Sequence, residues 1–357
     1  MIYNVIYYRC VVAVLINIVL LFILDASHKG DIVLKEVEWS IQKEVEQNIY
    51  YPIQVALCDD EIILSDYEGI HPFRRYSTDL EYLDTIGEWG RGPGEVVKPA
   101  YIAGCEKDIV YAYSDLNRTM TMYRKSGEYL GNIDSPRLYQ SLDARVVDNT
   151  LIIVTTQLNP YAIGFPFIQK RDAEVKNDTV MYGDKNEISP LETVSEYRNI
   201  LLKDGIMSSD GRNFYAALRY GSLLMGFTVE GENLFHTLQP HNVDIPEYGA
   251  GEHYGVQPPF SEYPHAYITI DVDERYVYTI FSGAELSSRN VITGRMEHKI
   301  LQGKLLNIHD KTTGEYKFTI EMPFLIGGIA VSDDAIYAIS RYPEIRLVKF
   351  EKPDILR

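Results

Sequence analysis

Arginine and tyrosine stand side by side at two places where short β-rich segments end, in Arg219-Tyr220 and Arg341-Tyr342. An arginine guanidinium offers a planar pair of donors that fits a carboxylate or a phosphate. A tyrosine ring can stack on a sugar or on another ring. The same residue types recur in other connecting segments, which predicts a site for an anionic or sugar-like group made of Tyr67, Arg91, Arg118, Arg219, Tyr220, Arg341 and Tyr342. The alternative is that each arginine forms a salt bridge with an acid of a neighbouring unit.

Catalytic motifs are missing from the sequence. It has no Ser-His-Asp order, no His-Glu-x-x-His motif and no Gly-x-Ser-x-Gly elbow. His241, His253 and His265 fall in a stretch rich in Pro and Gly, where surface positions are expected rather than a metal site. We therefore assign no catalytic residue, no metal ligand and no cofactor.

The segments that carry the candidate binding residues belong to a repeat. In each unit an apolar strand meets a turn of Asp, Asn, Ser, Glu or Gly, and a Tyr- or Ile-rich strand and two further strands follow. The second strands are expected at Glu61–Asp66, Asp108–Asp115, Asn149–Thr156, Arg212–Tyr220, Arg275–Gly283 and Ala335–Tyr342. Successive turn acids lie 40 to 63 residues apart, a period typical of four-stranded propeller blades. The sequence predicts an all-β fold, a six-bladed β-propeller with an apolar N-terminal helix; a pair of β-sandwiches is the alternative.

The propeller fold determines where the candidate residues lie. The loop after each second strand and the crossover to the next blade reach one face, around the central channel, where ring-shaped folds bind ligands. The last unit is one strand short, and Ile32–Val37 is expected to supply that strand. This closure matters because an open ring leaves unpaired strand edges.

Composition limits the partners of the protein. The 357 residues include 51 Asp and Glu against 34 Lys and Arg, which gives a net charge of −17. This charge argues against a nucleic-acid partner, which needs a basic surface. Cys58 and Cys105 stand in similar contexts, Ala-Leu-Cys-Asp-Asp and Ala-Gly-Cys-Glu-Lys, which favours two small buried residues at equivalent repeat positions. A disulfide between them is the alternative.

The N-terminus carries an apolar run from Val11 to Leu24, interrupted by Asn17 and preceded by Arg9. Residues 1–30 are therefore expected to form a signal peptide or a membrane anchor, and residues 31–357 the propeller. Arg9 on the amino-terminal side predicts that the propeller lies outside the cytoplasm, on the periplasmic or extracellular side of the cell envelope, anchored or secreted.

Two segments resemble known propellers. Ser114–Tyr123 resembles the core of the NHL repeat, in which Asp and Arg precede an alternating strand. Ile86–Glu95 resembles the Gly-x-Gly-Pro-Gly-Glu loop of six-bladed propellers abundant in Bacteroides-like bacteria. The resemblance implies a six-bladed propeller of the NHL or TolB-like type at the cell envelope. Val96 stands where that family has an aromatic residue, and Cys10 is not preceded by a lipobox.

The Gly90–Gly94 loop has two interpretations. Its exposed amides could form a nest for an anion, or the loop could be a tight crossover between blades. The resemblance also leaves two functions open. The first is a non-enzymatic envelope propeller that binds a protein, peptide or glycan. The second, suggested by lactonase-like propellers, is a calcium-dependent hydrolase with Asp143, Asn199 and His265 near its channel.

Overall fold

The computed structural model describes the chain from residue 32 to residue 357 with internal gaps. The described ranges are 32–114, 116–117, 119–134, 143–148, 150–154, 162–166, 180–182, 205–219, 221–243, 265–283, 287–289, 296–298 and 302–357. The predicted N-terminal segment, residues 1–30, lies outside them. In the part of the chain that the structure describes, no helix is long and apolar enough to cross a membrane.

Five antiparallel sheets of four strands form most of the molecule. Four of them are continuous in sequence. The first sheet contains β3 (Pro52–Cys58), β4 (Glu61–Asp66), β5 (Phe73–Ser77) and β6 (Tyr82–Ile86), and the second contains β9 (Tyr101–Glu106), β10 (Ile109–Tyr113), β11 (Thr119–Arg124) and β12 (Tyr129–Asp134). The third contains β13 (Ala144–Val147), β14 (Thr150–Val154), β15 (Ala162–Pro166) and β16 (Val180–Tyr182), and the fourth contains β17 (Gly205–Ser209), β18 (Asn213–Leu218), β19 (Leu224–Thr228) and β20 (Asn233–Thr237). The fifth joins the two ends of the described chain and contains β27 (Gly328–Val331), β28 (Ala335–Ser340), β29 (Arg346–Glu351) and β2 (Ile41–Val45).

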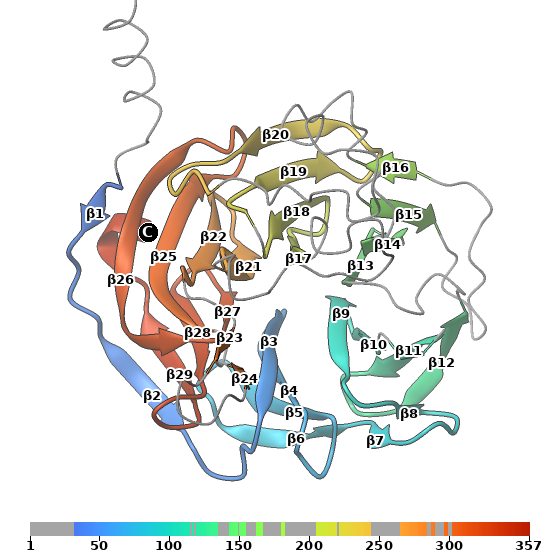
Figure 1. Ribbon diagram of the computed structural model, residues 1–357. Coiled ribbons are helices and arrows are strands. Elements are labelled where there is room, and N and C mark those ends of the chain that lie inside the picture. Colours follow the sequence, from blue (N-terminus) through green and yellow to red (C-terminus); the bar gives the residue numbers. More distant parts are fainter. Residues whose placement is uncertain are drawn as a thin grey trace, which may run out of the picture.

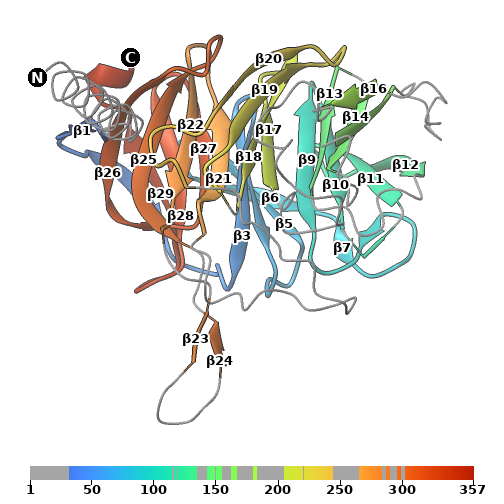
Figure 2. The ribbon, with the colours of Figure 1, turned by 45° about the horizontal axis from the view of Figure 1, so that its top comes forward.

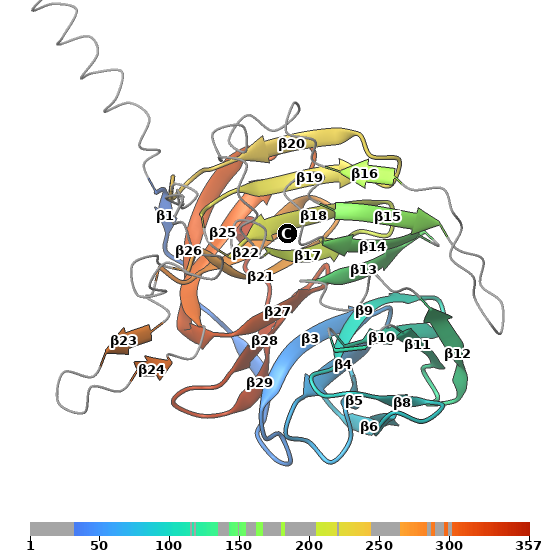
Figure 3. The same ribbon diagram turned by 45° about the vertical axis from the view of Figure 1, so that its right-hand side comes forward.

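A further large sheet has five strands. Its order is β21 (Tyr267–Val272), β22 (Tyr276–Phe281), β25 (Gly303–Asp310), β26 (Tyr316–Ile326) and β1 (Leu34–Lys35). A hairpin of β23 (Ser287–Arg289) and β24 (Met296–His298) is inserted between β22 and β25, and it projects from the body of the molecule (Figures 2 and 3). A short parallel pair, β7 (Glu88–Trp89) and β8 (Glu95–Val96), connects β6 to β9, and a 3-10 helix spans Asp354–Leu356.

The sheets surround a central axis (Figure 1). The innermost strands contact one another in the order β3, β9, β13, β17, β21 and β27, and β27 contacts β3. The predicted β-propeller is therefore confirmed, and every expected second strand is present. The sequence pattern predicts six regular four-stranded blades, whereas the structure has five; the remaining large sheet departs from the pattern because β1 adds a strand to its outer edge.

The core lies between neighbouring sheets. Ile62 and Leu64 pack against residues of the last sheet, whereas Ile63 between them packs against the following sheet, and all three are fully buried. Consecutive residues of a strand point to opposite faces, so a sheet that is covered on both faces needs an uninterrupted apolar run. This explains why the second strands read as continuous Ile, Val, Tyr and Ala segments.

The ring closes through a different segment from the one predicted. β2 (Ile41–Val45), not Ile32–Val37, is the strand that pairs with β29 and completes the last sheet. Within Ile32–Val37, β1 pairs in parallel with β26 of the preceding sheet. Burial explains the difference, because Val45 packs on the core between the last and first blades whereas Leu34 remains 53% exposed.

Cys58 and Cys105 form a disulfide, with Cα atoms 5.4 Å apart. The favoured expectation of two separate buried residues is wrong, and the alternative is correct. The contexts look alike because the two residues occupy equivalent ends of adjacent innermost strands, β3 and β9, and this adjacency also brings their side chains together. The disulfide covalently links the first two blades.

A repeated lysine holds neighbouring blades together at the end of the ring where each innermost strand turns into the second strand, here called the turn end. Lys125, Lys311 and Lys352 each follow the third strand of their sheet. Each reaches an acid in the turn of the preceding sheet: Lys125 to Asp59 at 2.8 Å, Lys311 to Asp210 at 3.1 Å and Lys352 to Asp273 at 2.5 Å.

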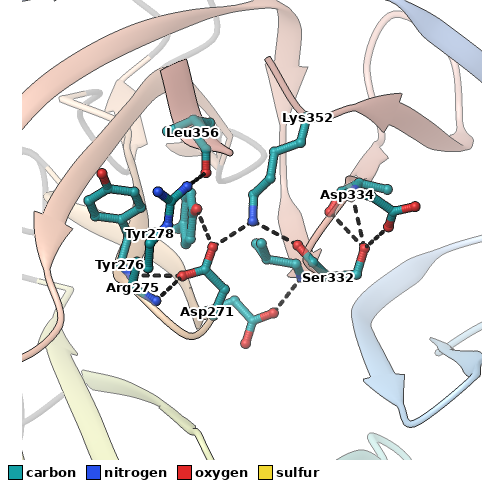
Figure 4. A network of polar contacts seen from close by, with 11 residues as sticks. Asp271, Arg275, Tyr276, Tyr278, Ser332, Asp334, Lys352 and Leu356 are labelled. Carbon is teal, nitrogen blue, oxygen red and sulfur yellow. Dashed lines mark hydrogen bonds and ion pairs between the residues drawn. The ribbon is translucent and has the colours of Figure 1, made fainter. Parts of the chain in front are cut away.

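The Lys352 pair is the most buried of these contacts, with 1% of the Lys352 side chain and 5% of the Asp273 side chain exposed. Lys352 Nζ also donates to the Ser332 carbonyl at 2.7 Å and lies over the Tyr278 ring (Figure 4). Burial alone would raise the pKa of Asp273, but hydrogen bonds from Lys352, Tyr278 and Tyr276 lower it overall. The pair is therefore ionised and ties the last sheet to the five-stranded one.

Candidate functional site

The opposite end of the ring, where the outer strands connect to the next innermost strand, is here called the mouth end. Asp66, the last residue of β4, is fully buried there, and its carboxylate accepts hydrogen bonds from Tyr50 N at 2.9 Å and Tyr51 N at 2.7 Å. Tyr67 N donates in turn to the Tyr51 carbonyl at 2.9 Å. These bonds fix the main chain of Tyr51 and Tyr67, and so they orient two aromatic rings at the mouth end.

Aromatic rings and cations alternate along this surface. The Tyr51 and Tyr67 rings meet edge to face with centroids 6.1 Å apart. Lys98 Nζ lies 5.6 Å from the Tyr67 centroid and 4.8 Å from the Trp89 centroid. Trp89 Nε1 donates to the Gly69 carbonyl at 2.8 Å, which holds the loop after β4 against the crossover to β9. Lys98 is thus placed by two rings, each a favourable partner for a cation.

Arg341 also contacts Tyr51. Its guanidinium carbon lies 5.6 Å from the Tyr51 centroid. The guanidinium passes so close to Gly327 that a Cβ there would lie 2.8 Å from Arg341 Nη2. Burial lowers the pKa of Arg341 from its usual value, Tyr51 opposes this, and the charge of Arg219 lowers it further. Arg219 and Arg341 come from different sheets, and each follows the second strand of its sheet at the mouth end.

His265 lies beside Arg219 at the entrance to β21. It is 1% exposed, and burial together with the charge of Arg219 lowers its pKa to about 3. The expectation of a surface position is wrong for His265, because the crossover that carries it is pinned inward by the bond from Ala266 N to the Arg219 carbonyl at 2.7 Å. The neutral imidazole adds no charge to the site at neutral pH.

The structure places three of the predicted binding residues, Tyr67, Arg219 and Arg341, at the mouth end. With Tyr51, Trp89 and Lys98 they form what is here called the mouth cluster. Tyr342 neighbours it and is 60% exposed. Arg118 and Tyr220 lie outside the described residues. The sequence analysis missed Tyr51, Trp89 and Lys98, although each stands in a crossover to an innermost strand, the same position that directed attention to Arg91.

Arg91 is exposed and stands in the loop between β7 and β8. Its loop packs on the outer strands of the second blade, where the Tyr123 hydroxyl donates to the Gly94 carbonyl at 2.9 Å and a Cβ on Gly94 would touch the Tyr129 ring. The Glu95 carboxylate occupies the Gly-rich loop and accepts from Gly92 N at 2.6 Å. The loop therefore acts as a crossover between blades that carries its own anion, and the interpretation as a nest for an external anion is not supported.

The residues considered for a calcium site serve other roles or lie outside the described ranges. Asp143 Oδ1 accepts from the Tyr113 hydroxyl at 2.8 Å and from Arg145 Nη1 at 2.7 Å, and Asp143 Oδ2 accepts from Met207 N at 2.8 Å. These bonds join three successive sheets. Asn199 is not described. Among the residues that the structure describes, no group of three or more His, Cys, Asp or Glu could hold a metal ion.

No protein-family model and no curated protein match the sequence. Among solved structures, a DUF4221 family member from Bacteroides vulgatus is similar with a TM-score of 0.54 and 10% identity, over 88% of this chain and 98% of the other. A Bacteroides fragilis protein described as exported gives 0.49 at 10% identity over 89% and 95%. The WD40 β-propeller domain of Doa1 gives 0.44 at 11% identity over 90% and 99%. At such identities the likeness establishes the fold alone, and the chain is a β-propeller protein.

Proposed function

We propose that this protein is a non-enzymatic binding protein of the cell envelope that holds a protein, peptide or glycan partner at the mouth end of its propeller. The mouth cluster is the observation that carries the proposal. Tyr67 and Arg341, which come from the first and last blades, both contact Tyr51, and Lys98 lies over Tyr67. Fixed rings and cations of this kind suit recognition of anionic or sugar-like groups.

The fold provides a rigid frame for such binding. We infer that the five-stranded sheet serves as the sixth blade, because its innermost strand β21 contacts β17 and β27 as the other innermost strands contact their neighbours. The protein would then belong with the six-bladed NHL and TolB-like propellers. The loops of a closed ring are held by strands on all sides, so little ordering is needed when a ligand binds.

An extracytoplasmic location is supported by two features. The Cys58–Cys105 disulfide is of a kind that persists in oxidising compartments. The apolar run from Val11 to Leu24 suits a signal peptide or an anchor. A variant that lacks residues 1–30 is expected to fold and to leave the membrane fraction; continued sedimentation of that variant with membranes would contradict the anchor.

The binding proposal is tested with the full chain as bait against envelope extracts. A double variant, Lys98→Gln with Arg341→Gln, is expected to lose the captured partner, because it removes two cations and keeps side chains of similar length. Arg124→Gln is the matched control, since Arg124 pairs with Asp108 and Glu128 at the turn end. Equal capture by the double variant and the control, at equal melting temperature, would refute a role of the mouth cluster.

A further inference from the structure

The segment from Ile32 to Val45, here called the strap, follows the apolar run of the N-terminus after a short interval. Only residues 25–31 separate the strap from Leu24, the last residue of that run. The sequence Leu-Asp-Ala at 24–26 does not match the small-x-small pattern at which a signal peptide is removed. Of the two roles proposed for residues 1–30, this favours the anchor.

The main chain of the strap is fixed on the propeller from its first residues. Val33 N donates to the Tyr316 hydroxyl at 3.1 Å, and the Val33 carbonyl accepts from Thr319 N at 2.9 Å. Further along, Trp39 Nε1 donates to the Glu321 carbonyl at 2.8 Å, and the strap then pairs with β29 of the last sheet as β2. An anchor that precedes the strap therefore holds the propeller at a defined place on its surface.

The length of the interval limits which side of the propeller can face the membrane. Eight steps of extended chain join Leu24 to Ile32 and span at most about 29 Å. A folded domain of this length has a radius of gyration of about 20 Å and is about 50 Å across. Because β1 lies on the outer edge of the five-stranded sheet, at the periphery of the ring (Figure 1), the opposite periphery cannot reach the bilayer that holds the anchor.

The strap exposes consecutive apolar side chains where it begins. Ile32 is 45% exposed, Val33 44% and Leu34 53%. Charged residues of both signs follow them, Lys35 and Glu36, so the start of the strap has no excess of charge that would attract it to a charged surface. Exposed apolar groups are unfavourable in water, whereas the boundary between headgroups and acyl chains of a bilayer can bury them.

We propose that the strap contacts the surface of the bilayer in which residues 1–30 are anchored, with Ile32, Val33 and Leu34 at the lipid interface. The outer edge of the five-stranded sheet then faces the membrane. The mouth cluster lies at one end of the ring rather than at its periphery, so it remains accessible to a partner. This inference rests on the anchor in the proposed function and adds the orientation of the propeller.

The two tryptophans of the chain are suitable probes, because Trp39 belongs to the strap and Trp89 to the mouth cluster. The full chain is purified in detergent and reconstituted into phosphatidylcholine vesicles with brominated acyl chains, since bromine quenches nearby tryptophan fluorescence. In Trp89→Phe, the emission of Trp39 is expected to be about twofold lower than in unbrominated vesicles, because the strap lies at the interface. In Trp39→Phe, the emission of Trp89 should be equal in both, and the wild type should show an intermediate loss.

A further pair of variants tests the apolar side chains. Ile32→Ser with Leu34→Ser, made in the Trp89→Phe variant, should remove most of the quenching without changing flotation with the vesicles. Ile70→Ser with Leu83→Ser is the matched control, since these side chains of the first sheet are 72% and 45% exposed. The control should leave the quenching unchanged.

The outcomes separate the orientation from the anchor. Flotation without quenching of Trp39, or with equal quenching of Trp39 and Trp89, would overturn the orientation and leave the anchor intact. Quenching of Trp39 that the Ile32 and Leu34 changes do not reduce would overturn the apolar contact. If the full chain is a dimer in detergent and these changes make it a monomer, a second copy covers the strap and the lipid contact is wrong. If the full chain does not float with the vesicles, the anchor fails and the inference fails with it.

Discussion

Three lysines at the turn end and two cations at the mouth end have different partners. At the turn end, Lys125, Lys311 and Lys352 each contact a carboxylate of the preceding blade. At the mouth end, Lys98 and Arg341 lie over aromatic rings. A cation paired with an acid of another blade contributes to the stability of the ring, whereas an aromatic ring holds a cation by attraction to its face. Under the proposed function, the ion pairs that stabilise the ring lie at one end of the innermost strands and the binding residues lie at the other end.

The largest effect is expected at the turn end, at the buried pair of Lys352 and Asp273. Lys352→Met should lower the free energy of unfolding by about 3–5 kcal/mol, because it leaves the Asp273 carboxylate buried without its cation. Urea unfolding followed by Trp and Tyr fluorescence measures the change. Adding Asp273→Asn to this variant should restore part of the loss. A decrease below about 1 kcal/mol would mean that the turn end does not stabilise the ring in this way.

Asp271 provides a second test of the contacts between blades at the turn end. Its carboxylate accepts from Ser208 Oγ and from Val331 N, both at 2.6 Å, and burial raises its pKa to about 6. A carboxyl group with a raised pKa contributes stability below its unfolded pKa, and this stability is lost as pH rises through 6. Asp271→Asn removes the charge, and its amide can still accept from Val331 N through Oδ1 and donate to Ser208 Oγ through Nδ2. The stability of this variant relative to wild type should therefore rise by roughly 2–3 kcal/mol between pH 4 and pH 8. If the difference in melting temperature between the variant and the wild type does not change with pH, the prediction is contradicted.

His265 gives the corresponding test at the mouth end. Its pKa in the folded protein is lowered to about 3, so the stability that the neutral ring contributes is present above the unfolded pKa and lost as pH falls. Between the unfolded and the folded pKa, His265 should lower the free energy of unfolding by about 1.4 kcal/mol for each pH unit by which the pH falls. His265→Gln should remove this pH dependence. Unfolding measured from pH 6.5 to pH 4.5 provides the comparison, with exposed His236→Gln as control. Parallel profiles for His265→Gln and wild type would show that burial of His265 does not resist protonation.

The smallest effect is expected at Lys125, where the partner Asp59 is 61% exposed. Lys125→Ala should lower the free energy of unfolding by less than about 1 kcal/mol, because Asp59 keeps its contact with water. The loss should shrink further at high salt, which screens exposed pairs. A loss as large as that of Lys352→Met would show that burial does not decide the strength of these contacts.

Much of the fold was predictable from local patterns. Apolar runs such as Glu61–Asp66 and turn acids such as Asp273 identified the second strands and the inner hairpins, because these features depend on residues a few positions apart. The partners across blades were not predictable in this way. Lys125 and Asp59 are 66 positions apart, and Lys352 and Asp273 are 79 apart. The choice of β2 over β1 for closure likewise depended on burial against the last sheet.

The residues of the candidate site were likewise predictable only in part from the sequence. Arg219 and Arg341 attracted attention from the sequence because both follow a second strand, and the ring places both at the mouth end. Arg91 shares their chemistry, but its side chain is exposed and its loop packs through Gly94 on Tyr123 and Tyr129 of the second blade. Lys98 and Tyr51 gave no distinct signal, because a single lysine or tyrosine in a loop is ordinary.

By itself the sequence determined an all-β repeat covered on both faces, since strand periodicity and turn chemistry are short-range properties of the chain. Tertiary structure alone decided which cation meets a carboxylate and which lies over a ring. That choice depends on crossovers and loops of separate blades, and only closure of the ring fixes the distances between them.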